Sequence, residues 1–217
     1  MKDTNQLLRQ NKEWSQRRRL EDPAFFERLA LTQSPKFLWI GCSDSRVPAD
    51  AITGTQPGEI FVHRNIANMV VHTDLNLLSV LTYAVDVLKV EHVIVCGHHA
   101  CGAMRAAMSA EDFGMLNEWL RNIKDVYASD YERLQAITDD QEREDELVEL
   151  SAIAQMQNLA KTSIVQNAWR DRQGPWLHAW VYDLSDGILH ELADRPPDTK
   201  LGPPYAFERN GTSAKAE

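Results

Sequence analysis

The chain has 217 residues, enough for one domain with a sizeable buried core. Its formal net charge of −9 argues against a surface dedicated to nucleic acid. No apolar run reaches the length of a membrane span, and the first residues lack the apolar core of a secretory signal. We therefore expect a cytoplasmic protein with no membrane partner. Three cysteines, an odd and small number, favour metal or thiol chemistry over a disulfide framework.

The N-terminal part of the chain has a helical pattern. Residues 1–20 read as one helix, and a second helix follows until Pro35 breaks it. We expect residues 1–34 to form a helical arm of a single domain that spans 1–195. After Arg195 the chain is rich in proline and polar residues, so 196–217 is predicted to be a loosely ordered C-terminal tail.

From residue 36 onward, short apolar runs alternate with helical patterns. The runs at 36–41, 59–64 and 92–97 read as strands, and 74–89 has the apolar spacing of a helix. Residues 115–169 are mostly helical, and 175–192 form two further strands around a turn. The alternation predicts an α/β fold with a mainly parallel central β-sheet flanked by helices.

Metal-binding residue types follow two of these strands. The stretch WIGCSDSRVPAD places Cys42 directly after the first strand, and CGHHACGA places His98 and Cys101 after the third. Ligands of α/β sheets gather at the carboxyl ends of the strands, so the three residues are expected to lie together. Two thiolates and one imidazole are zinc ligands, and they leave a fourth position for water or substrate.

Simpler explanations exist for each of these residues. A single cysteine is most often a buried core thiol, and we assign that role to Cys96, which lies inside a predicted strand. The sequence indicates no role for His99 beyond orienting the turn. A serine nucleophile elbow does not fit, because Ser45 stands where the G-x-S-x-G pattern needs glycine. Nucleotide-binding glycine motifs are missing from the sequence.

The combination of CSDSR and HHAC resembles the C-x-D-x-R and H-x-x-C motifs of the β-class carbonic anhydrases. The resemblance continues through PGEIFVHRNIAN and WVYDLSDG and covers residues 37 to about 189. It implies the β-carbonic anhydrase fold, one zinc ion per chain and the reversible hydration of carbon dioxide to bicarbonate and a proton. It also implies a homodimer, commonly paired into a homotetramer. Its zinc ligands would be Cys42, His98 and Cys101.

Zinc lowers the pKa of a water that it binds, an effect best known from carbonic anhydrases with three histidine ligands. Two thiolates should acidify water less, so activity should favour mildly alkaline pH. We then expect Asp44 and Arg46 to act as a catalytic pair. The Asp44 carboxylate orients the reacting water, and the Arg46 guanidinium holds that carboxylate through bidentate hydrogen bonds. The resemblance also implies substrate-binding roles for Gln33, Phe61, Ile66 and Tyr83.

A further resemblance is to the bacterial, allosteric (type II) branch of the family. In that branch the aspartate that corresponds to Asp44 becomes a fourth zinc ligand in a closed state, which bicarbonate stabilises. Trp39, Arg64 and Tyr182 stand in the matching sequence contexts for the bicarbonate pocket. The chemistry fits, since a guanidinium, an indole and a phenol all donate hydrogen bonds to a small anion.

Two other functions share these motifs. One is a zinc hydrolase of carbon disulfide or carbonyl sulfide, which metal ligation alone cannot separate from a carbonic anhydrase. The other is a non-catalytic, zinc-containing module that binds bicarbonate. Asp44 and Arg46 argue against the second, because a purely structural zinc usually has four fixed protein ligands.

Overall fold

The computed structural model describes residues 3–208, and the chain divides into two compact units, Met1–Ser34 and Pro35–Glu217. The first unit holds the helices α1 (Thr4–Glu21) and α2 (Phe25–Leu31). The Asp3 carboxylate caps α1 by accepting a hydrogen bond from a backbone N–H of its first turn. Neither helix has a buried residue within the chain, so both keep their side chains available to solvent or to a partner.

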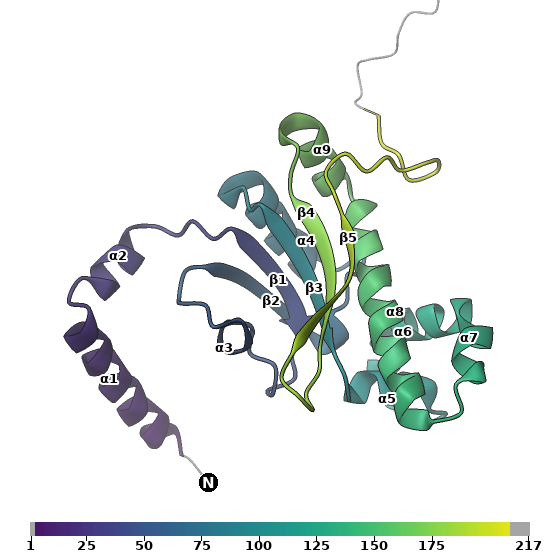
Figure 1. Cartoon of the computed structure of the whole chain (residues 1–217), viewed down its shortest axis with the longest axis horizontal. Helices are drawn as coiled ribbons and strands as arrows, with labels where there is room; N and C mark the ends of the chain where they lie inside the picture. Colours follow the sequence, from purple (N-terminus) through teal and green to yellow (C-terminus); the bar gives the residue numbers. More distant parts are fainter. Residues whose placement is uncertain (1–2, 209–217) are drawn as a thin grey trace, which may run out of the picture. The chain divides into compact units, whose positions relative to one another are not determined.

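The second unit is built on one five-stranded sheet, in which the strands lie in the order β2-β1-β3-β4-β5 (Figure 1). The first four strands of this order run parallel, and β5 pairs antiparallel with β4. This mixed, mainly parallel sheet confirms the predicted fold class. The strand bounds are β1 Phe37–Cys42, β2 Ile60–Asn65, β3 His92–His98, β4 Trp176–Tyr182 and β5 Leu189–Arg195.

Helices connect the strands and cover one face of the sheet. The predicted helix at 74–89 consists of an α-helix capped by the Asp74 carboxylate and a final π-helical segment. The longest helix, α8, packs along β3 and β4 (Figure 1). The bounds are α3 Ala49–Thr53, η1 Ile66–Asn68, α4 Leu75–Thr82, η2 Tyr83–Leu88, α5 Gly102–Met108, α6 Leu116–Ser129, α7 Tyr131–Ala136, α8 Asp140–Ala160 and α9 Ser163–Arg172.

Successive side chains of a strand point to opposite faces of the sheet, and the two faces pack against different helices. Leu38 and Ile40 of β1 are fully buried in a cluster with α4, α8 and α9. Full burial of such a side chain contributes about 1.5–3 kcal/mol. Trp39 and Cys96 face the other side, in a smaller cluster with α3. Burial raises the pKa of the Cys96 thiol, which fits a core cysteine.

The described part of the C-terminal segment lies along α9. The side-chain amide of Gln166 donates to the Tyr205 carbonyl at 2.8 Å and accepts from the Phe207 N–H at 3.0 Å. A loosely ordered tail over 196–217 stays a prediction, and residues 209–217 lie outside the described residues.

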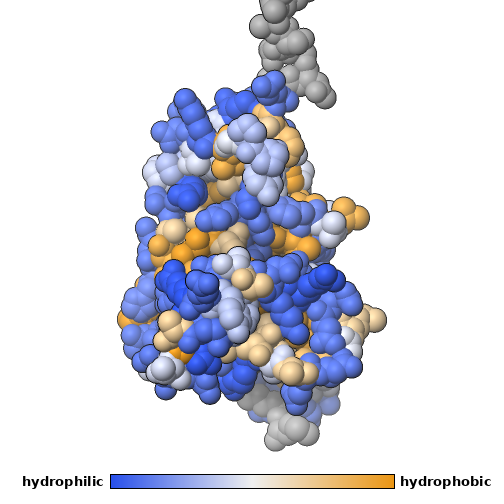
Figure 2. All heavy atoms as spheres, turned by 90° about the vertical axis from the view of Figure 1, so that its right-hand side faces the viewer, coloured by the Kyte–Doolittle hydropathy of each residue, from blue (hydrophilic) through white to orange (hydrophobic). Residues whose placement is uncertain are grey.

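Hydrophilic residues dominate the surface in the view of Figure 2, with hydrophobic residues interspersed among them. Within residues 3–208, no helix combines the length and the apolar composition needed to cross a bilayer.

Candidate metal centre

Three buried side chains meet at the carboxyl ends of β1 and β3. Cys42 is the last residue of β1, His98 is the last residue of β3, and Cys101 is the residue that precedes α5. Their sulfur and imidazole nitrogen atoms all lie within 4.8 Å of one another. β1 and β3 are adjacent and parallel, so residues far apart in the sequence share one edge of the sheet.

The imidazole of His98 is oriented to act as a metal ligand. Its Nδ1 lies 2.9 Å from the carbonyl oxygen of His99 and therefore carries the proton, which leaves a lone pair on Nε2. That Nε2 is buried and has no hydrogen-bond partner among the described residues. An unsatisfied buried polar atom costs about 1–3 kcal/mol, so a cation in contact with Nε2 would remove a real penalty. The donor set and its geometry therefore fit zinc.

The two thiols change each other's pKa in opposite directions. The Cys101 thiol, and to a smaller extent His98, lower the pKa of the Cys42 thiol although burial opposes this change. The same pairing, together with burial, raises the pKa of the Cys101 thiol. Because the thiolate is the form that binds metal, binding of a divalent cation here would release any proton that the thiols still carry.

Asp44 and Arg46 form a close pair beside these ligands. The Arg46 Nε donates to Asp44 Oδ1 at 3.0 Å, and Nη2 donates to Oδ2 at 2.6 Å. This side-chain pairing, despite some burial, holds the pKa of Asp44 well below its usual range, so the carboxylate is ionised at neutral pH. Asp44 Oδ2 is 3.8 Å from the Nε2 of His98, so the carboxylate borders the candidate metal position.

The substrate-binding roles of Gln33, Phe61, Ile66 and Tyr83 stay predictions. The rings of Phe61 and Tyr83 lie 5.8 Å apart, from β2 and η2. Gln33 lies in the N-terminal unit, between α2 and β1, and its side chain is exposed. Ile66 is exposed as well, and it lines a cavity together with Val71 and Trp119.

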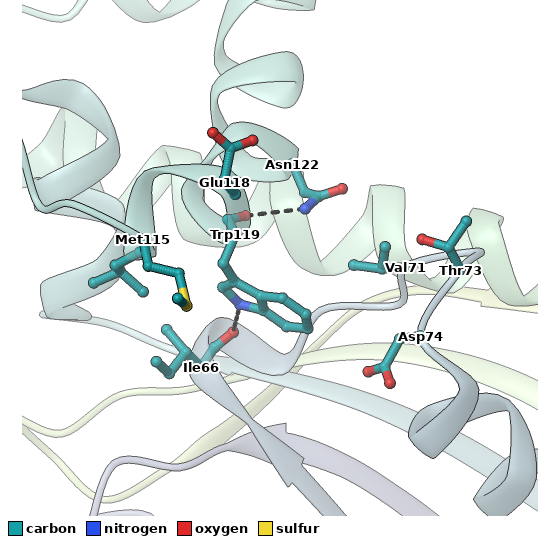
Figure 3. A pocket seen from close by; sticks show the side chains of 9 residues that line it. Ile66, Val71, Thr73, Asp74, Met115, Glu118, Trp119 and Asn122 are labelled. Atoms are coloured by element: carbon teal, nitrogen blue, oxygen red, sulfur yellow. Dashed lines mark hydrogen bonds between the residues drawn. The ribbon is translucent and has the colours of Figure 1, made fainter.

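The cavity beside Ile66 has a volume of about 730 Å³ (Figure 3). The indole Nε1 of Trp119 donates to the carbonyl of Ile66 at 2.8 Å and fixes one wall. The cavity is mainly apolar, with Asp74 and Glu118 at its border. Sequence reasoning missed Trp119, because a tryptophan within the charged pattern of α6 gives no sign of its distant partner.

The three residues of the predicted regulatory pocket share one face of the sheet, as the strand registers require. Trp39 is 2% exposed, and Tyr182 packs against the same small cluster. The Arg64 side chain donates from Nε to the carbonyl of Cys42 at 2.7 Å, and from Nη2 to the carbonyl of Asp44. Arg64 thus connects this face directly to the loop that carries Asp44.

Comparison with known proteins agrees with this geometry. Residues 37–189 match the model of the carbonic anhydrase family. A carbonic anhydrase of Emericella nidulans is 48% identical over 188 residues, which cover 87% of this chain and 82% of that protein. A carbonic anhydrase of Pseudomonas aeruginosa is 38% identical, with 77% of each chain covered.

Solved structures give the same result. A crystal structure from Sordaria macrospora, one of two tetrameric β-carbonic anhydrases, is 40% identical with a TM-score of 0.85, over 87% of this chain and 96% of that one. The Coccomyxa β-carbonic anhydrase in complex with acetazolamide is 35% identical with a TM-score of 0.86, over 90% and 89%. This chain therefore belongs to the β class of the carbonic anhydrase family and is a lyase.

Proposed function

We propose that this chain uses one zinc ion, held by Cys42, His98 and Cys101, for the reversible hydration of carbon dioxide to bicarbonate and a proton. The observation that carries the proposal is the set of three buried ligand atoms within 4.8 Å of one another, bordered by an ionised carboxylate. A three-ligand set leaves room for substrate, which distinguishes a catalytic zinc from a structural one.

Bound zinc supplies Lewis acidity, which makes a water molecule acidic enough to act as the nucleophile near neutral pH. The ionised Asp44 accepts a hydrogen bond from the reacting water and thereby directs an oxygen lone pair toward carbon dioxide. Arg46 holds both carboxylate oxygens and keeps this orientation. Phe61 and Tyr83 offer an apolar surface for an apolar gas, and Gln33 would donate a hydrogen bond to the substrate.

We also propose that bicarbonate and low pH inhibit the enzyme, as in the bacterial type II branch. Arg64 donates to the backbone on both sides of Ser43, so an anion that competes for its N–H groups would loosen the Asp44 peptide. Asp44 would then leave Arg46 and turn toward the metal ligands, 3.8 Å from His98 Nε2 at present. A ligand that prefers this closed state must shift the population toward it.

The proposed assembly is a homodimer or homotetramer. The Sordaria macrospora relative is tetrameric, and the helices α1 and α2 bury none of their own residues within the chain. Sedimentation at several protein concentrations would measure the oligomeric state, and a monomer at all of them would contradict this proposal.

The central test is a stopped-flow assay of carbon dioxide hydration, run with and without a zinc chelator, above and below neutral pH. We expect zinc-dependent activity that rises toward alkaline pH and falls steeply when bicarbonate is added at lower pH. A parallel assay with carbon disulfide and carbonyl sulfide tests the rival zinc hydrolase. Faster turnover of either sulfur compound than of carbon dioxide would overturn the assignment of the substrate.

A further inference from the structure

His99, the neighbour of the ligand His98, lies between two carboxylates. Its Nε2 is 3.2 Å from Glu149 Oε1 on α8, and its Nδ1 is 3.5 Å from Asp183 Oδ2 just beyond β4. Only 19% of the His99 side chain is exposed. Burial and the contact with Glu149 restrict the orientation of this ring.

The backbone of His99 also contacts His98, the candidate metal ligand. The His99 carbonyl accepts the proton of His98 Nδ1 at 2.9 Å, and the His99 N–H donates to the carbonyl of Tyr182 at 3.0 Å. The orientation of the His98 imidazole therefore depends on where the His99 peptide is held. Partners of this kind fix the tautomer and the ring position of a ligating histidine.

The next residue of the loop has a conformation that needs support. Ala100 has φ 53°, in the left-handed region that side-chain-bearing residues seldom adopt. Its N–H donates to Asp145 Oδ1 at 3.1 Å. Asp145 and Glu149 are four residues apart on α8, so one face of this helix presents both carboxylates to the loop.

The position of α8 is itself fixed by close packing against β3. A Cβ atom at Gly97 would lie 2.9 Å from the Cγ1 of Val148, so the helix approaches the strand directly before His98. Val148 is fully buried, and it precedes Glu149 in the chain. The carboxylate that contacts His99 therefore stands on a rigid element.

We propose that His99 is a positioning residue of the metal centre, held by Glu149, and that this contact retains the zinc ion by fixing the His99 peptide. The inference rests on the zinc site of the proposed function and goes beyond it, because the H-x-x-C pattern leaves the residue after its histidine unspecified. Loss of a partner that orients a metal-bound histidine typically costs about 10–100-fold in metal affinity. Glu149→Ala and His99→Ala should both show a loss of this size.

The test uses the full-length, zinc-loaded protein and four variants: His99→Ala, Glu149→Ala, Glu149→Gln and Glu142→Ala. Glu149 is the informative acid because, among the described residues, its side chain pairs only with His99, whereas Asp183 also supports the turn at Ser185. Glutamine at 149 keeps an oxygen that can accept from His99. Glu142 is an exposed acid of the same helix and serves as the matched control.

Two measurements are made on each protein: the rate at which a chromogenic chelator removes zinc, and the visible absorption spectrum after replacement of zinc by cobalt(II). We expect removal to be about 10–100-fold faster in His99→Ala and Glu149→Ala, with an altered cobalt spectrum. Glu149→Gln should restore most of the retention, and Glu142→Ala should match the wild type.

Melting temperatures with and without zinc separate positioning from general loop packing. A merely structural role would lower both values equally, whereas a positioning role lowers mainly the increase that zinc produces. If the wild type binds no zinc, the proposed function itself fails. If the wild type binds zinc and His99→Ala retains it equally well with an unchanged cobalt spectrum, only this inference is overturned.

Discussion

The two loops that supply the candidate metal ligands share one kind of backbone hydrogen bond, but different side chains hold them in place. Each loop donates one backbone N–H to the end of the neighbouring strand: Ser43 to Asn65 of β2 at 2.8 Å, and His99 to Tyr182 of β4 at 3.0 Å. Beyond these bonds, the first loop is held by the guanidinium groups of Arg46 and Arg64. The second is held by the carboxylates of α8 and of the β4 end.

This difference follows the chemistry that each loop performs. The Arg46 guanidinium lowers the pKa of Asp44 and keeps it ionised, and it is an exchangeable partner because its side chain is 52% exposed. The carboxylates beside the second loop accept from the His99 ring and from the Ala100 N–H, while the His99 carbonyl accepts from His98 Nδ1 and leaves the lone pair of Nε2 free for a metal. The proposals above assign partner exchange to the first loop and metal retention to the second.

The largest expected effect comes from breaking the retaining loop. Cys101→Ser removes a thiolate ligand, so zinc content and hydration activity should fall by more than the roughly 100-fold that an outer partner is worth. Metal analysis of the purified protein and stopped-flow rates measure the two effects. Cys96→Ser, which changes a core thiol, is the control for thiol loss. A Cys101→Ser protein with full zinc and full activity would refute the metal centre.

The next effect comes from the exchanging loop. Asp44→Asn keeps the shape of the side chain but removes the ionised acceptor, so the turnover number should fall by about 100-fold or more. Zinc content should stay at the wild-type level, because Asp44 is outside the three-ligand cluster. Activity within a few-fold of the wild type would show that the carboxylate does not orient the reacting water.

The proposed regulation gives a smaller, conditional effect. Trp39→Ala should relieve bicarbonate inhibition, although emptying so buried a site costs about 3–5 kcal/mol of stability. Tyr182→Phe removes only a hydroxyl group and should weaken the inhibition several-fold while it keeps the fold. Trp176→Ala, a partly exposed position of the same strand, is the control. Inhibition curves at pH 7 that coincide for all four proteins would contradict the pocket.

The smallest expected effect is on the pH dependence of the free energy of unfolding. Arg46 lowers the pKa of Asp44 in the folded chain, so the unfolded chain binds more protons at acidic pH. The pair therefore stabilises the fold above the ordinary aspartate pKa of about 3.9, and this contribution is lost as the pH falls through the folded value. The zinc-free Arg46→Ala protein should melt below the wild type at pH 7, and the difference should shrink below about pH 4. A constant difference would rule out this linkage.

The comparison also explains which parts of the site could be predicted. Cys42, His98 and Cys101 could be predicted as a group because each follows an apolar strand pattern, and parallel strands end at one edge. Asp44 and Arg46 could be paired because they are two residues apart. The shared substrate-binding role of Phe61, Ile66 and Tyr83 stays a prediction, since strand patterns do not say which helix covers a side chain.

The sequence by itself determined the donor atoms, the alternation of strands and helices and the family, because these features are written in local patterns and short motifs. Only the tertiary structure decided what holds the metal loop. Glu149 stands 50 residues from His99 in the chain, and their contact exists because α8 packs against β3 at Gly97. Such a contact depends on the distance between a helix and a strand, which no run of neighbouring residues specifies.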